Sequence, residues 1–134
     1  MLKFISFLRN LKKIRISFVT PKKCDLIVFE ERQISDLRYI LNKRKYFVLN
    51  YKEDPKINIY LSFKILLKIL KYFKGNLYSA YLASIIELIS PKLVITFFDN
   101  SIKFYDLNIL FKNKIQFLAI QNGGRTDILH YKHE

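Results

Sequence analysis

The hydrophobic residues of this 134-residue chain gather in short runs that alternate with longer segments of helical periodicity. Apolar runs without polar alternation are typical of strands buried on both faces of a parallel sheet. They predict strands over 24–29, 46–51, 93–98 and 116–120, with a short edge strand over 57–60. Helical spacing predicts helices over 30–42, 61–73, 77–89 and 102–112. This alternation predicts an α/β fold, a Rossmann-like parallel sheet of four to five strands with flanking helices.

The segment 61–73 is strongly apolar except for a narrow stripe of lysines, Lys64, Lys68, Lys71 and Lys74. Such a pattern predicts a helix almost buried between layers, with lysine ends that reach water. Gly75 tolerates a left-handed backbone and predicts the end of this helix, and Pro91 predicts the end of the next.

The amino-terminal segment 1–20 is basic and amphipathic. Residues 1–23 carry Lys and Arg but no acidic residue, and apolar side chains at helical spacing, Phe4, Phe7, Leu8 and Leu11. One interpretation is a helix that lies on an anionic membrane surface. The other is a first helix packed on its own domain, or a frayed basic end. A signal peptide would need a longer uninterrupted apolar core.

The net charge of +13 is unevenly distributed, because residues 1–76 hold 18 Lys and Arg against 6 acids, and residues 77–134 hold 6 against 5. This asymmetry predicts a basic face suited to phosphate, nucleic acid or anionic lipid, unless the lysines merely solvate helix faces. The single Cys24 excludes an internal disulfide, and its place at the start of an apolar run suggests packing. No apolar stretch is long enough for a transmembrane helix.

Polar residues follow two predicted strands where those strands end. The carboxyl ends of parallel strands share one edge, where open α/β sheets bind ligands. We therefore predict a substrate-binding site made of Asp99, Asn100, Gln121, Asn122, Gly123, Gly124 and Arg125. Asp99 could bind a sugar hydroxyl or act as a base, and the glycine amides with Arg125 suit a phosphate or carboxylate. The structural alternatives are a helix N-cap within 99–101 and an ordinary Asn-Gly turn.

Other chemistry lacks support in the sequence. The first turn carries Glu30-Glu31-Arg32 in place of a glycine-rich dinucleotide motif, so we expect no cofactor. Walker A, C-x-x-C and G-x-S-x-G motifs are absent. His130, His133 and Glu134 are too few for a metal site, so no metal is expected. Because the aromatic residues are assigned to strands and buried helices, nucleic acid is not expected as a partner.

The residues 91–100, followed by Phe104-Tyr105, then Ile120-Gln121-Asn122-Gly123 and Arg125, resemble a bacterial surface-carbohydrate biosynthesis family of capsule and lipopolysaccharide. Those proteins look like GT-B-type glycosyltransferases and are related in architecture to UDP-N-acetylglucosamine 2-epimerase. The resemblance spans about residues 22–127. It implies that residues 21–134 form the Rossmann-like amino-terminal domain of a GT-B-type protein, expected to be truncated.

The resemblance further implies an acceptor-side domain of a glycosyltransferase that is inactive alone, with no catalytic residue assigned. Its partner would be a sugar acceptor, either lipid-linked or free; a nucleotide sugar would bind only with a missing carboxyl-terminal half. The implied location is cytoplasmic, with peripheral association on the inner face of the cell membrane. The alternative is a non-catalytic basic domain that binds anionic lipid or nucleic acid.

Overall fold

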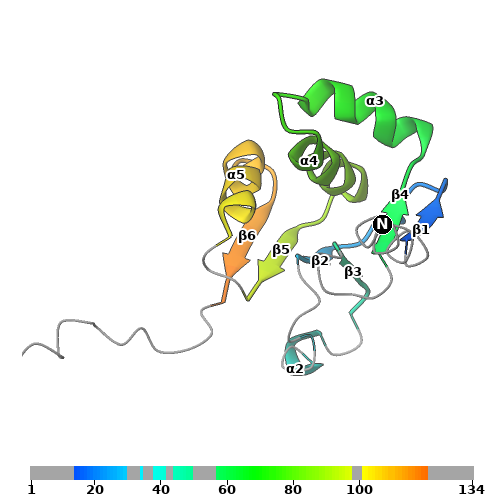
Figure 1. The fold of residues 1–134 in the computed structure, drawn as a ribbon. Helices are drawn as coiled ribbons and strands as arrows, with labels where there is room; N and C mark the ends of the chain where they lie inside the picture. The colour runs from blue at the N-terminus through cyan, green and yellow to red at the C-terminus, as the bar shows by residue number, and fades with distance from the viewer. Residues whose placement is uncertain are drawn as a thin grey trace, which may run out of the picture.

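The computed structural model describes residues 14–29, 34, 38–41, 44–49, 57–97 and 101–120. The elements of these residues follow the alternation expected from the sequence (Figure 1). In chain order they are β1 (Ile14–Ser17), β2 (Leu26–Val28), α2 (Arg38–Leu41), β3 (Tyr46–Val48), β4 (Ile57–Tyr60), α3 (Phe63–Tyr72), α4 (Leu77–Ile89), β5 (Leu93–Thr96), α5 (Ile102–Phe111) and β6 (Gln116–Ala119).

The main sheet has four strands in the order β3-β2-β5-β6, and every neighbouring pair is parallel. Leu26 of β2 pairs with Tyr46 on one side and with Leu93 on the other. The chain therefore moves one way from β2 to β3 and the opposite way from β5 to β6. Right-handed crossovers then place the connecting helices on opposite faces. The prediction of a Rossmann-like α/β sheet is confirmed.

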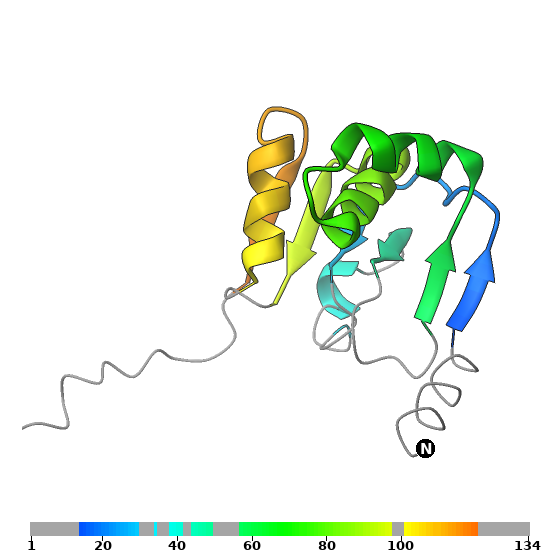
Figure 2. The same cartoon turned by 45° about the horizontal axis from the view of Figure 1, so that its top comes forward.

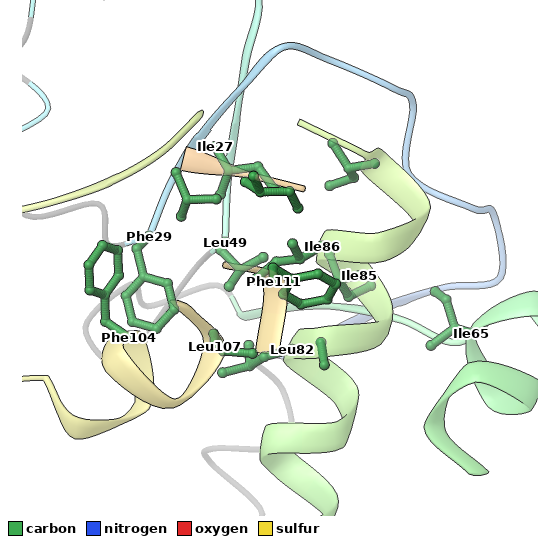
Figure 3. Close-up of a cluster of buried hydrophobic side chains, with 14 residues drawn as sticks. Ile27, Phe29, Leu49, Ile65, Leu82, Ile85, Ile86, Phe104, Leu107 and Phe111 are labelled. Carbon is green, nitrogen blue, oxygen red and sulfur yellow. The ribbon is translucent and has the colours of Figure 1, made fainter. Parts of the chain in front are cut away.

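The two faces of the sheet carry two separate groups of buried side chains. Ile27, Phe29 and Val94 pack against α4 and α5 (Figure 3). Leu26, Val28 and Ile95 face the other way and pack with Leu41 of α2. Since β2 is buried on both faces, its sequence Leu-Ile-Val shows no polar alternation.

Helix α4 covers the centre of the main sheet. Its buried residues include small ones that let the backbone approach the strands, Ala80, Ala83 and Ser84, and large ones that fill the core, Leu82, Ile85, Ile86 and Ile89. The side chain of Asn76 caps its start by accepting from Ser79 N at 3.0 Å. Ser90 ends it in a left-handed conformation (φ 54°), directly before Pro91. The end predicted from Pro91 is confirmed.

Strand β1 was not predicted, since residues 1–20 were expected to form a helix or a frayed end. Residues 14–17 instead pair in parallel with β4, and residues 1–13 lie outside the described residues. The alternation Ile14-Arg15-Ile16-Ser17 is the signal for a half-exposed strand. The predicted strand over 57–60 exists as β4, but it belongs to this second, two-stranded sheet.

A tyrosine separates β4 from the main sheet. The hydroxyl of Tyr81 accepts a hydrogen bond from Tyr60 N at 2.9 Å, a donor that a neighbouring strand would otherwise use. The rings of Phe47 on β3 and Tyr60 on β4 lie 5.6 Å apart, and a cavity of about 50 Å³ remains between these strands and α4. Figure 2 shows β1 and β4 side by side, beyond β3.

The expectation that helix 61–73 is almost buried is wrong. Helix α3 packs against α4 and lies outside it, as an outer layer (Figure 2). Ile65 is its one buried residue, whereas Phe63 and Leu70 are each 74% exposed. The reason is that α4 and α5 already cover this face of the sheet. Among the described residues, no helix is both long enough and apolar enough to cross a membrane.

Candidate functional site

The segments that lead to the predicted site residues leave the sheet side by side. Strands β5 and β6 are parallel neighbours in which Thr96 pairs with Ala119, and Ile120 N donates to Thr96 O at 2.8 Å. Phe97 and Ile120, the last described residues of the two segments, are thus at the same edge. The seven predicted residues, Asp99, Asn100, Gln121, Asn122, Gly123, Gly124 and Arg125, lie outside the described residues and follow these two ends in the sequence.

This edge contains the point where the strand order reverses. The connection from β2 leads to β3 on one side, and the connection from β5 leads to β6 on the other. Open α/β sheets bind ligands in the crevice outside the carboxyl ends of such a pair. A hydrogen bond from Phe29 N to Ile95 O, at 2.8 Å, joins the ends of β2 and β5. The topology therefore gives this edge a preference for ligands that is independent of any motif.

The described residues at this edge form an apolar, closely packed base. Phe29 at the end of β2 is 1% exposed, and its ring contacts that of Phe104 in an edge-to-face arrangement at 5.5 Å. The ring of Phe104 contacts Phe117 in the same way at 5.3 Å. Thr96, at the end of β5, is fully buried. This close packing holds the strand ends in fixed positions, from which the following segments start.

Helix α5 begins at the same edge, because it follows β5 directly. Ser101 is its N-cap, and the Ser101 hydroxyl accepts from Phe104 N at 3.4 Å. Of the three possible caps at positions 99–101, the structure therefore uses the last. Asp99 and Asn100 precede the cap, which weakens capping as the explanation for these two residues. The amino terminus of a helix also favours a negatively charged ligand.

A hollow of about 870 Å³ lies at the other edge of the main sheet, where the strands begin. It is lined by residues that come just before the strands, and four of them are basic: Lys23, Arg44, Lys45 and Lys92. Lys92 Nζ lies 3.5 Å from the Asp25 carboxylate, but both side chains are largely exposed, so the pair contributes little. Sequence reasoning missed this group; the signal was a basic residue shortly before each of three strands.

Cys24 also lines this basic hollow. Burial raises the pKa of its thiol, and the sulfur donates a hydrogen bond to Leu26 O at 3.2 Å. A raised thiol pKa keeps the group neutral and unreactive. The side chain packs against the main core, so the expectation of a packing role is confirmed.

The most perturbed acid among the described residues joins α3 to α4. Glu87 of α4 contacts Lys68 and Lys71 of α3, each at 2.9 Å. Burial alone would raise the pKa of Glu87, but its contacts with Lys68, Lys71 and Tyr72 lower it to about 2. This carboxylate is committed to the contact between two helices, so we assign it a structural role.

Within residues 14–29, 34, 38–41, 44–49, 57–97 and 101–120, no group of three His, Cys, Asp or Glu side chains could hold a metal ion. His130, His133 and Glu134 lie outside these ranges. Comparison with known proteins found no matching family model, no matching curated protein and no matching solved structure.

Proposed function

We propose that this chain is the acceptor-side domain of a glycosyltransferase in bacterial surface polysaccharide synthesis, with its ligand at the carboxyl edge of the main sheet. The observation that supports this proposal most is the reversal of strand order between β2 and β5. The two polar motifs that resemble the surface-carbohydrate family follow β5 and β6, so their starting points share this edge.

In this proposal the two motifs have different tasks. The Asp99 carboxylate contacts a hydroxyl of the acceptor sugar, with Asn100 beside it in sequence. The amides of Gly123 and Gly124 and the guanidinium of Arg125 bind an anionic group of the acceptor. The start of α5 adds its favourable potential for negative charge.

The acceptor in this proposal is a lipid-linked sugar phosphate at the inner face of the cell membrane. Transfer then requires a nucleotide-sugar-binding half, so we expect the 134-residue chain to bind acceptor-like ligands without turnover. Turnover by the purified chain with any nucleotide sugar would overturn that part of the proposal.

The test is a titration with a sugar phosphate, such as glucose 1-phosphate, in which NMR chemical shifts of the backbone amides are measured. We expect shifts at Phe29, Phe97 and Ile120, and about tenfold or greater weakening in Asp99→Asn and Arg125→Ala, as expected for lost charge-assisted hydrogen bonds. Arg44→Ala, at the opposite edge, is the matched control and should bind normally. Binding that is lost in Arg44→Ala and kept in Arg125→Ala would move the site to the basic hollow and overturn the proposal.

A further inference from the structure

The outer face of α3 exposes large apolar side chains to solvent. Phe63, Leu66, Leu67 and Leu70 are 74%, 47%, 51% and 74% exposed. They lie opposite Ile65, the residue that α3 buries against the core. Phe73, the C-cap residue, adds a further exposed ring. Several such residues on one short helix form a patch, and exposed apolar patches commonly mark interaction sites.

Two further large apolar side chains are exposed just after β1, in the segment that lies beside the start of α3. Phe18 and Val19 are 75% and 70% exposed. Two hydrogen bonds hold this segment beside the start of α3: Leu61 N donates to Ser17 O at 2.8 Å, and Thr20 Oγ1 donates to Ser62 Oγ at 3.0 Å. Ser62 is the N-cap of α3. The segment that follows β1 and the start of α3 therefore belong to one part of the molecule.

The charge around this surface is positive in balance. Residues 57–76 contain four lysines, Lys64, Lys68, Lys71 and Lys74, and no acidic residue. At about 100° per residue, the first three lie on one flank of α3, between its exposed apolar face and its buried side. Glu87 of α4 contacts Lys68 and Lys71 and so fixes two of them along this flank.

We propose that the α3 outer face, with Phe18 and Val19, is a docking surface for a bilayer that contains anionic lipids. An amphipathic helix with large apolar residues on one face and lysines beside it lies in the plane of the membrane interface, with its apolar side chains among the acyl chains and its lysines among the headgroups. At about 1.5 Å per residue, α3 is about 15 Å long, far too short to span a bilayer.

The charge pattern favours a bilayer over a second copy of the chain. Two copies that met through this face in a two-fold dimer would bring the same surface together twice. Their lysine flanks would then lie near each other, and each flank has only the Glu87 carboxylate against three lysines. A bilayer with anionic lipids offers both an apolar interior for the exposed side chains and headgroups of charge opposite to the lysines. The inference uses none of the residues assigned to ligand binding, so it stands apart from the proposed function.

The first test is flotation of the chain with phosphatidylcholine vesicles, with and without phosphatidylglycerol. We expect binding to the anionic vesicles, and at least about tenfold weaker binding for the double variant Phe63→Ser with Leu70→Ser. The matched control is Ile109→Ser with Leu110→Ser on α5, whose side chains are 74% and 45% exposed, and it should bind like the unchanged protein. Absence of binding by the unchanged protein, or equal loss in the control, would overturn the proposal.

The chain contains no tryptophan, so the fluorescence of a single introduced tryptophan reports whether that position enters the bilayer. In Leu67→Trp, fluorescence should shift to the blue when anionic vesicles are added, and in Ile109→Trp it should stay unchanged. Both substitutions are at exposed positions and leave the core intact. Equal shifts at the two positions would contradict a specific docking face. Because Leu67→Trp keeps an apolar residue on α3, this readout does not depend on the folding of the serine variants.

The attraction between the lysines and anionic lipids is tested separately. Lys64→Glu with Lys74→Glu should remove the preference for anionic vesicles, and added salt should weaken binding by the unchanged protein. A concentration-dependent dimer in sedimentation, abolished by Phe63→Ser with Leu70→Ser, would assign the face to self-association and overturn the proposal. Asp99→Asn and Arg125→Ala should leave vesicle binding unchanged, so failure here and failure of the proposed function are distinguishable.

Discussion

Helices α3 and α4 are consecutive in the chain, both rich in leucine and isoleucine, and opposite in burial. α4 has small residues, Ala80, Ala83 and Ser84, that bring its backbone close to the sheet, and seven of its residues are buried. α3 has no small residue at all, and one of its residues is buried. The difference shows that leucine content does not decide which helix covers the sheet. In this pair, the helix with small side chains at the contact lies close to the sheet, and the helix with three lysines and no small residue becomes the outer layer.

The largest expected effect on stability comes from truncating one side chain to alanine in each of the two helices. Ile86→Ala in α4 removes a fully buried side chain and should lower the free energy of unfolding by about 2–5 kcal/mol. Leu70→Ala in α3 should change it by about 0.5 kcal/mol or less, because the leucine is 74% exposed. Urea unfolding followed by circular dichroism measures both. Similar losses in the two variants would show that α3 is buried in solution.

A smaller effect should follow from Tyr81→Phe, which tests whether α4 also holds β4. The substitution keeps the ring but leaves Tyr60 N without its acceptor, so we expect a loss of about 1–3 kcal/mol. Hydrogen exchange at the Tyr60 amide should become faster. Tyr105→Phe on α5, where the ring contacts Phe104 in an edge-to-face arrangement, is the matched control and should leave that amide unchanged. Unaltered exchange in Tyr81→Phe would mean that the hydroxyl is dispensable.

The smallest effect concerns the carboxylate that joins α3 to α4. The pKa of Glu87 is lowered from 4.5 to about 2 in the folded protein. Its contribution is therefore complete above the unfolded pKa and is lost as the pH falls from about 4.5 towards 2. Glu87→Gln should remove about 1 kcal/mol at neutral pH, since water screens these contacts, and should flatten stability in that range.

Asp106→Asn is the control for this pH experiment, because Asp106 is an exposed acid on α5. It should retain the pH dependence of the unchanged protein between pH 4.5 and 2, measured by urea unfolding at each pH. A pH profile of Glu87→Gln identical to that of the unchanged protein would show that the contacts with Lys68 and Lys71 do not persist in solution.

The sequence was sufficient for elements whose pattern has one structural solution. The non-alternating run of β2 could only be buried on both faces, and Pro91 had to end α4. Burial of α3 could not be predicted, because it depended on α4 and α5 taking the available face of the sheet. β1 was missed because its partner β4 lies about forty residues further along the chain, and isolated short strands carry little signal.

For the candidate site, too, the sequence predicted one part and missed another. Its edge could be predicted, because polar residues after two parallel strands must begin at the same side of the sheet. The basic hollow at the opposite edge could not, because Lys23, Arg44, Lys45 and Lys92 come together only through the register of three strands. Each of these residues, taken alone, resembles an ordinary solvated lysine or arginine.

The central position of β2 has a consequence for synthesis of the protein. Its first neighbour, β3, follows closely in the chain, but its second, β5, leaves the ribosome only after α3 and α4. Until then one side of an entirely apolar strand lacks its partner, a state in which nascent chains are prone to associate. Slow pairing of distant strands prolongs that interval. The burial of β2 that stabilises the finished domain therefore also makes its late completion the step at which a chaperone would be most useful.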